Sequence, residues 1–270
     1  MPELPEVEIA RQQLTEWTEG RSIQSVVVED KQRVTGAPTQ LIGGQCVVWQ
    51  RQGKLLLGTF NNGLTILAHL GMTGKWVANP EPERPHQRFH LHLEEGRAPK
   101  RVVFIDARRF GFVDVVSSSN AGEHPRVRSL GPDALDSRWS PERLKKRLGS
   151  SRSPLKQKLM DQHAIAGLGN IAASEIAWRA RLHPHTPANG VTLAQWGAIA
   201  EGMTAHLEAT LAAEEGPEIR YQGERNATNP FSCYGREGEP CGHCGFLLCR
   251  VVLSGRPTFY CPHCQPRLDA

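Results

Sequence analysis

Two pairs of cysteines near the end of the chain limit its possible folds more than any other feature. They stand as Cys241-x-x-Cys244 and Cys261-x-x-Cys264, with sixteen residues between the pairs. Pairs at this spacing are typical of a structural zinc site, whereas disulfide scaffolds are found in short secreted chains. Glycines and prolines around the cysteines favour a β-hairpin. We therefore predict one structural Zn²⁺, held by Cys241, Cys244, Cys261 and Cys264 in a closed site that takes no part in catalysis.

Two histidines inside the cysteine pairs, His243 and His263, are alternative zinc ligands. Because the set of four thiolates is complete, the all-cysteine site is the better prediction. The other three cysteines are Cys46, Cys233 and Cys249.

The chain of 270 residues can hold two domains, and its hydrophobic content of 39% is enough for a buried core. It contains no apolar stretch of eighteen residues and no basic segment followed by an apolar one. Membrane spans and secretory leaders have these features, so we expect neither, and we expect a cytoplasmic protein.

The N-terminal segment Met1-Pro-Glu-Leu-Pro-Glu-Val-Glu8 indicates an amine nucleophile. Removal of the initiator methionine in front of the small residue Pro2 leaves a free secondary amine. Such an amine condenses with an aldehyde to a cationic iminium, which is an efficient electron sink. Glu3 stands beside it and is a candidate to move protons. The alternative is that proline only opens a helix, because its missing N–H costs nothing in the first turn.

Hydrophobic periodicity predicts an α+β chain whose first part is a helix followed by strands. Apolar residues at helical spacing from Val7 to Trp17 predict an amphipathic helix. Short β-prone segments then alternate with Gly, Asn and Pro turns, as in an antiparallel β-sandwich. The predicted strands are Ser22–Val28, Gln45–Trp49, Leu55–Phe60, Leu64–Ala68, Phe89–Leu93, Val102–Ile105 and Phe112–Val116.

Beyond a boundary rich in Ser, Gly and Pro at residues 117–131, the chain becomes helical. Two Ser-Pro dipeptides each indicate an N-cap followed by proline in the first turn, and Thr192-Leu-Ala-Gln195 indicates a capping box. The predicted helices begin at Pro141 and Pro154 and span Ile171–Leu182 and Thr192–Ala213. A basic segment from Arg143 to Lys158 contains no acidic residue, which suits a phosphate backbone or, equally well, a solvated helix face.

Three glycine turns carry side chains suited to nucleic acid. Arg51-Gln-Gly-Lys54 places a lysine at the mouth of a strand, where it could contact a phosphate, although a single lysine is usually only solvated. The turns His69-Leu-Gly-Met-Thr-Gly74 and Asp106-Ala-Arg-Arg-Phe-Gly111 contain Met72 and Phe110. Exposed Met, Phe and Arg side chains suit a wedge that fills the gap left by an extruded nucleotide. Ordinary packing is the alternative for either turn alone.

Two later segments are candidate phosphate contacts. Gly167-Leu-Gly-Asn170 stands just before a helix, where free N–H groups bind anions and the amide of Asn170 can add a hydrogen bond. The alternative is that Asn170 only caps the helix. Ser254-Gly-Arg-Pro-Thr258, at the tip of the zinc hairpin, presents Arg256, whose guanidinium suits a phosphate or an extrahelical base.

Together these motifs resemble the formamidopyrimidine-DNA glycosylase/endonuclease VIII family of base-excision repair enzymes. The resemblance continues through Gly-Leu-Gly-Asn-Ile-Ala-Ala-Ser-Glu175 and Tyr234-Gly-Arg-Glu-Gly-Glu-Pro-Cys241, and it covers nearly the whole chain in the right order. It implies double-stranded DNA bound between two domains. The implied parts are a catalytic β-sandwich at residues 1–125, a helix–two-turns–helix domain at 126–230 and a zinc hairpin at 231–270.

The resemblance also implies a role for each candidate residue. The expected catalytic residues are the nucleophile Pro2, the proton donor and acceptor Glu3 and, at the lesion's phosphate, Lys54. The residues expected to fill the void in the duplex are Met72, Arg108 and Phe110. The residues expected on the DNA backbone or around the flipped nucleotide are His69, Lys156, Asn170 and Arg256.

The implied activity is that of a bifunctional DNA glycosylase and abasic-site lyase, acting by β,δ-elimination on oxidised bases. Leu4 and the Arg-Arg-Phe-Gly111 turn resemble the formamidopyrimidine branch, so purines such as formamidopyrimidines or 8-oxoguanine are the expected lesions. Alternatives are the same chemistry on oxidised pyrimidines, a protein that binds damaged DNA without cutting it, and a zinc-ribbon module that binds RNA or acts in transcription. We expect a monomer associated with the nucleoid.

One segment departs from the family pattern. Members that act on 8-oxoguanine typically carry a loop containing Gly-Gly-Thr between the last long helix and the zinc segment, whereas residues 214–232 here lack that motif. Arg220 and Tyr221 could contact the base instead, with a solvated loop as the alternative.

Overall fold

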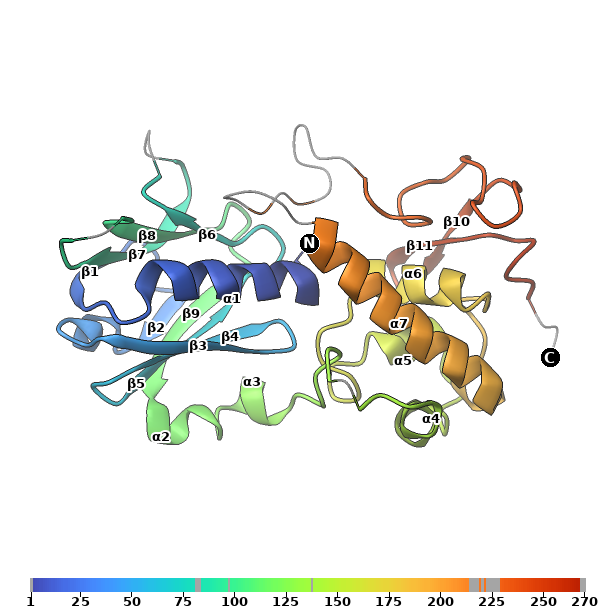
Figure 1. The fold of residues 1–270 in the computed structure, drawn as a ribbon, viewed down its shortest axis with the longest axis horizontal. Helices are drawn as coiled ribbons and strands as arrows, with labels where there is room; N and C mark the ends of the chain where they lie inside the picture. Colours follow the sequence, from blue (N-terminus) through green and yellow to red (C-terminus); the bar gives the residue numbers. More distant parts are fainter. Residues whose placement is uncertain are drawn as a thin grey trace. The chain divides into compact units, whose positions relative to one another are not determined.

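The computed structural model describes residues 2–80, 84–96, 98–136, 138–213, 219, 221 and 229–267. The chain forms two compact units, which Figure 1 draws as a ribbon. The first comprises residues 1–129 and 214–227, and the second comprises residues 130–213 and 228–270. The predicted fold class, a β-sandwich with an N-terminal helix followed by a helical domain and a hairpin with four cysteines, is confirmed.

The first unit contains two sheets and the helix α1, Leu4–Thr18. The four-stranded sheet has the order β1-β7-β8-β6 and the five-stranded sheet the order β2-β9-β5-β4-β3. Neighbouring strands are antiparallel except for β2 and β9, which are parallel. The strands are β1 Ile23–Val28, β2 Val34–Gly36, β3 Cys46–Gln52, β4 Leu55–Phe60, β5 Leu64–His69, β6 Lys75–Ala78, β7 Gln87–Leu93, β8 Arg101–Ile105 and β9 Phe112–Ser117.

Helix α1 closes one side of the sandwich, because it packs against β3 and β6, an end strand of each sheet. Its apolar face, which includes Val7, Ala10 and Leu14, is fully buried. The core between the sheets is aromatic: the ring of Trp76 lies 5.2 Å from that of Phe104, and further rings surround the pair. The short helices η1 (Pro38–Leu41), α2 (Ser118–Ala121) and α3 (Pro125–Arg128) complete the unit.

Two residues from beyond the long helix α7 complete this core. Ile219 and Tyr221 are 3% and 4% exposed and belong to the hydrophobic cluster of the sandwich. The Tyr221 hydroxyl donates to the carbonyl of Gly74 at 2.5 Å, and the Lys75 ammonium donates to the carbonyl of Ile219 at 3.2 Å. Tyr221 is therefore a buried packing residue of the first unit, while Arg220 lies outside the described residues.

The second unit is helical and ends in a hairpin. Two of the three predicted N-caps are present, since the Ser140 hydroxyl accepts from the backbone N–H of Arg143 and the Thr192 hydroxyl from that of Gln195. The cap predicted at Ser153 is wrong, because Pro154 itself is the N-cap residue of the next helix and no side chain caps it. Its elements are α4 Pro141–Leu148, α5 Leu155–Leu159, α6 Asn170–Arg179, η2 Ala188–Gly190, α7 Leu193–Ala213, β10 Cys249–Leu253 and β11 Arg256–Tyr260. Helix α6 packs against α5, α7 and β11 and so joins the helices to the hairpin. Within the described part of the chain, no helix has the length and apolar character needed to cross a bilayer.

Candidate functional site

Pro2 and Glu3 are both buried at the beginning of α1. Glu3 is the N-cap residue, and its backbone N–H donates to the Glu6 carboxylate at 2.9 Å, as part of a reciprocal capping box. Glu6 was not among the predicted site residues, although Glu-x-x-Glu has the spacing of a capping box. This arrangement fixes the backbone at the point from which the Pro2 nitrogen and the Glu3 side chain emerge.

Lys54 lies in the two-residue loop that joins β3 to β4, with Gln52 and Leu55 as the closing pair. Gly53 supplies a φ of +56° at the first loop position, as type II′ hairpins require. The Arg51 guanidinium donates to the Gly53 carbonyl at 2.8 Å and binds Glu8 of α1 at 2.9 Å. The helix that begins at Glu3 thus also holds the hairpin that carries Lys54.

The Glu8 carboxylate remains charged in this position. Burial acts to raise its pKa, but the hydrogen bonds and charges of Arg11 and Arg51 outweigh that effect and hold the pKa below its ordinary value. The ion pair between Glu8 and Arg51 is therefore kept at neutral pH.

His69 ends β5 with a fixed and neutral imidazole. Its Nδ1 accepts the backbone N–H of Gly71 at 2.9 Å, so the ring proton is on Nε2. Burial, followed by the positive charges of Lys54 and Arg126, lowers the pKa of His69 to about 4. At neutral pH the ring can donate one hydrogen bond to a phosphate without adding a charge.

The His69 pKa predicts a loss of stability in mild acid. The unfolded chain takes up a proton near pH 6.5, whereas the folded chain takes it up only near pH 4. The free energy of unfolding therefore falls as the pH falls through this window, by up to about 3 kcal/mol for a shift of this size. Urea unfolding at pH 7 and pH 4.5 should show a smaller drop for His69→Gln than for the wild type. An equal drop in both proteins would contradict the neutral histidine.

The turns that contain Met72 and Phe110 pack against each other. A Cβ atom on Gly71 would lie 2.4 Å from the backbone nitrogen of Gly111, so only glycine allows this approach. Met72 is half-buried, whereas Phe110 is 52% exposed. The Arg108 guanidinium lies 5.0 Å from the centre of the Phe110 ring. The three residues predicted to fill a gap in the duplex therefore come from one rigid pair of turns.

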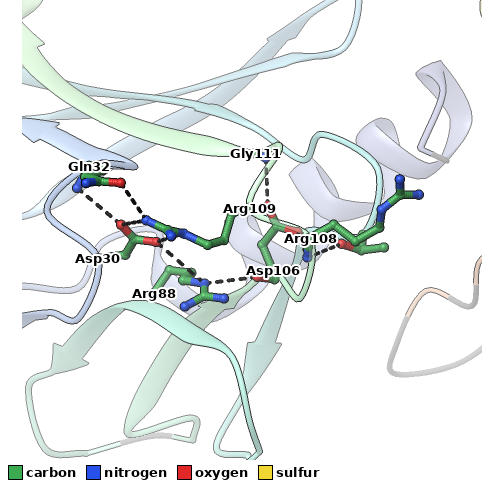
Figure 2. A network of polar contacts seen from close by, with 8 residues as sticks. Asp30, Gln32, Arg88, Asp106, Arg108, Arg109 and Gly111 are labelled. Carbon is green, nitrogen blue, oxygen red and sulfur yellow. Dashed lines mark hydrogen bonds and ion pairs between the residues drawn. The ribbon is translucent and has the colours of Figure 1, made fainter.

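The Asp106 carboxylate, 1% exposed, links these two turns (Figure 2). It accepts from the Thr73 hydroxyl at 2.6 Å and from the backbone N–H groups of Gly111 at 2.7 Å and Arg108 at 3.2 Å. Arg109 bends the chain with a φ of +57°, which directs its neighbour Arg108 away from the network in Figure 2. These contacts explain how the turn presents Arg108 and Phe110 to the outside.

A second carboxylate, Asp30, holds the other side of the turn. It binds the Arg109 guanidinium at 2.8 and 3.1 Å and lies 3.9 Å from that of Arg88. Burial would raise the pKa of Asp30, but the hydrogen bonds from Arg109 and from the backbone of Gln32 lower it. Asp30 thus stays ionised and keeps Arg109 as a structural residue while Arg108 faces outward.

Asp106→Asn is expected to destabilise the first unit by about 1–3 kcal/mol, because an amide NH₂ cannot accept the bonds that the carboxylate oxygens accept. The denaturant midpoint measures this loss. Asp114→Asn is the control, since the Asp114 carboxylate is only half-buried and accepts from the exposed Thr35 hydroxyl. Equal losses in the two variants would show that Asp106 has no special role.

In the second unit, the candidate residues surround the tip of the hairpin. Lys156 is 1% exposed, and its ammonium donates to the Thr258 hydroxyl at 2.6 Å and the Pro257 carbonyl at 3.2 Å. The Asn170 amide donates to the Pro257 carbonyl at 2.9 Å and to the Tyr234 hydroxyl at 3.1 Å. Both predicted phosphate contacts therefore hold the hairpin, and their contact with DNA remains a prediction.

Arg256 begins β11 directly after the two-residue turn of the hairpin, and it is exposed. The turn is attached to α5, because the Gln157 amide donates to the Ser254 hydroxyl. A cavity of about 300 Å³ opens here, lined by Lys156, Gln157, Met160, Leu253, Ser254 and Arg256. The alternative in which Asn170 caps α6 with its side chain is not seen, since Gly169 is the N-cap residue.

The four predicted zinc ligands lie together. The sulfur atoms of Cys241, Cys244, Cys261 and Cys264 are all within 4.8 Å of one another. Tetrahedral zinc with Zn–S bonds of about 2.3 Å needs S–S separations of roughly 3.8 Å, so the cluster fits the ion. The Trp178 indole N–H donates to the Cys241 sulfur at 3.4 Å, and its ring stacks on His243 at 4.0 Å. His243 therefore packs beside the site while the four thiolates form it.

A buried glutamate that the sequence did not single out ties the hairpin to α6. The Glu175 carboxylate, 1% exposed, accepts from the backbone N–H groups of Ser232, Cys233 and Tyr234 at 3.1, 2.7 and 2.7 Å. Its partners lie more than fifty positions away, so spacing alone could not reveal this contact. Glu175 belongs to the segment on which the family resemblance rests, and this was the only available signal.

Comparisons with known proteins point to one family along nearly the whole chain. Family models described as the formamidopyrimidine-DNA glycosylase N-terminal domain, its H2TH domain and the zinc finger found in FPG and IleRS match residues 1–113, 130–220 and 238–267. A formamidopyrimidine-DNA glycosylase of Desulfitobacterium hafniense is 33% identical over 274 residues, which is 98% of this chain and 100% of the relative. One of Methylobacillus flagellatus is 35% identical over 98% of this chain and 96% of its own.

Solved structures agree with these relatives. The MutM (FPG) protein of Thermus thermophilus has a TM-score of 0.84 and 32% identity, over 99% of this chain and 100% of that one. Lactococcus lactis Fpg in complex with DNA that contains an abasic site has a TM-score of 0.87 and 25% identity, over 98% and 100%.

Proposed function

Because the chain belongs to the formamidopyrimidine-DNA glycosylase family, it is a DNA glycosylase of base excision repair with abasic-site lyase activity, and we propose that the secondary amine of Pro2 is its nucleophile. One observation supports this choice above others. Pro2 and Glu3 lie at the start of the same helix whose Glu8 holds the Lys54 hairpin through Arg51. Nucleophile, proton carrier and lysine are thus parts of a single rigid assembly.

The reaction follows from the chemistry of a secondary amine. The nitrogen of Pro2, freed by removal of Met1, attacks C1′ of the damaged nucleotide, and the bond from C1′ to the base breaks. The departing base takes up a proton and the sugar ring opens to an iminium, with Glu3 as the proposed proton carrier. The iminium acidifies the C2′ proton, whose removal expels the 3′ phosphate. A second elimination expels the 5′ phosphate and leaves a one-nucleotide gap.

The DNA contacts are proposed from the two units separately. In the first unit, Lys54 and His69 would hold the backbone, and Met72, Arg108 and Phe110 would fill the gap in the stack. In the second unit, Arg256 would bind a phosphate, with Lys156 and Asn170 around it. The zinc hairpin supports this set, because Lys156 and Asn170 already bind its strand β11.

We propose oxidised purines, first formamidopyrimidines and then 8-oxoguanine, as the substrates. Support comes from the names of the relatives and from solved relatives in complex with DNA that contains Fapy-dG or carbocyclic 8-oxo-G. Residues 214–232 lack the Gly-Gly-Thr motif that is typical of members acting on 8-oxoguanine, and for this reason we propose formamidopyrimidines as the preferred substrates. Acting on chromosomal DNA, the enzyme is proposed to work as a monomer at the nucleoid in the cytoplasm.

A panel of duplexes, each with one defined lesion, tests the proposed substrates. We expect cleavage of Fapy-dG, 8-oxoguanine and abasic duplexes, and a covalent adduct when borohydride is added during the reaction. Cleavage confined to oxidised pyrimidines would overturn the purine assignment. Tight binding to an abasic duplex that stays intact would instead favour a protein that recognises damage without cutting.

A further inference from the structure

A stack of planar groups lies at the end of β5, beside the proposed backbone contacts. His69 and Phe112 are paired residues on the neighbouring strands β5 and β9. Their rings are nearly parallel, with an angle of 4° between the planes and 6.0 Å between the centres. The guanidinium carbon of Arg126, from α3, lies 4.0 Å from the centre of the Phe112 ring. Phe112 is therefore the platform on which Arg126 rests.

Arg126 differs from its neighbour on the same helix in its charge partners. Within the residues that the structure describes, no carboxylate lies within ion-pair distance of Arg126, whereas Arg128 pairs with Glu123 at 3.7 Å. The nearby Asp114 carboxylate lies 3.3 Å from the imidazole of His124. Arg126 is exposed, and a guanidinium that contacts a ring through its π face does not use its N–H donors as hydrogen bonds there, so they stay available to a phosphate.

The charge of Arg126 belongs to the same site as Lys54 and His69. Both cations act on the His69 imidazole, and together with burial they keep it neutral. The positive charge at this end of the sheet is therefore carried by Lys54 and Arg126. Neither of the motifs that contain Lys54 and His69 includes Arg126, which lies in the segment after the last strand of the sandwich.

We propose that Arg126 is a further phosphate contact of this enzyme and binds the DNA backbone beside the phosphate held by Lys54 and His69. The inference rests on the proposed role of those two residues. Packing alone explains little of the arrangement, because an exposed cation–π contact is a weak source of stability. The contact with the Phe112 ring already restricts the Arg126 side chain, so less side-chain freedom is lost on binding.

The salt dependence of DNA binding tests the proposal. The probe is a duplex with a tetrahydrofuran abasic analogue, which the enzyme binds but cannot cut, followed by fluorescence anisotropy between about 50 and 200 mM KCl. For Arg126→Gln, the slope of log Kobs against log[KCl] should become shallower by about 0.9, and affinity near 100 mM should fall roughly tenfold. Arg128→Gln is the matched control on the same helix and should keep the wild-type slope.

Two further variants separate binding from packing. Arg126→Lys keeps the charge and should restore the slope, whereas Phe112→Leu should weaken binding while the slope remains. If the role of Arg126 were purely structural, Arg126→Gln would have a lower urea midpoint, but its slope of log Kobs against log[KCl] would equal that of the wild type. That result, or an equal change of the salt slope in Arg126→Gln and Arg128→Gln, would overturn the inference. The proposed function would still stand, because the wild type would still bind abasic DNA. Failure of the wild type to bind or cleave abasic DNA would overturn the proposed function itself.

Discussion

Pro2→Gly is expected to reduce cleavage of a duplex with one oxidised purine by at least about 100-fold, because Pro2 is the proposed nucleophile and the proposed proton carrier, Glu3, can act only together with it. Glycine still permits removal of the initiator methionine, but it leaves a primary amine. The iminium from a primary amine can lose its remaining proton and become neutral, so it is a poorer electron sink. Borohydride trapping should fall with cleavage.

The matched control for this variant is Pro5→Ala. Pro5 is buried like Pro2, but it lies within the first turn of α1 and outside the proposed chemistry. It should keep wild-type trapping with only a modest loss of stability. Mass spectrometry of the mature N-terminus completes the experiment. Full activity in a protein that keeps Met1, or undiminished trapping by Pro2→Gly, would be incompatible with an N-terminal amine nucleophile.

Loss of zinc is expected to unfold the hairpin and to lower DNA affinity at least about tenfold, because the proposed charge-assisted contact between Arg256 and a phosphate depends on the folded hairpin. A structural zinc site contributes apparent binding energies of about 10–16 kcal/mol to folding, and an isolated two-stranded hairpin is marginal in water. Cys244→Ser should therefore lower the zinc content below one ion per chain. Metal analysis and binding to an abasic duplex measure both effects.

Cys249→Ser is the control for the zinc experiment. Cys249 begins β10 but is not part of the cluster formed by Cys241, Cys244, Cys261 and Cys264. It should keep one zinc ion per chain and wild-type affinity. Wild-type affinity in a zinc-free Cys244→Ser protein would show that the hairpin is dispensable for DNA binding.

Local sequence patterns predicted most of the fold. The seven expected strands and the helix that ends at Thr18 followed from hydrophobic periodicity, and the caps at Ser140 and Thr192 from contacts between residues three positions apart. The short strands β2 and β6, of three and four residues, were not predicted, because so few residues show no period. The helix expected from Pro154 is only five residues long. The helix expected to reach Leu182 ends at Arg179, before Arg181 adopts a positive φ.

The candidate site was predicted by residue type, but not in its supporting contacts. The zinc ligands followed from their spacing, and the structure brings their four sulfur atoms together. The burial of Lys156 against Thr258, which is 102 positions away, could not be predicted, because the basic segment suggested only a solvated or DNA-facing surface. The roles of Asp106 and Glu175 were also missed, because each carboxylate has a partner that only the folded chain brings close: the Thr73 hydroxyl for Asp106 and the backbone N–H of Cys233 for Glu175.

The positions of Ile219 and Tyr221 have a consequence for how the protein is made. These residues finish the core of the sandwich, yet the ribosome reaches them only after the helices of the other unit. Domains generally fold in the order of their synthesis, but here the leading unit must wait for a late segment of the chain. A nascent chain stalled at residue 129 would leave part of the Trp76 cluster exposed to water, and the second unit also takes its last part from residues 228–270, so neither unit can be completed until the chain beyond α7 has been made.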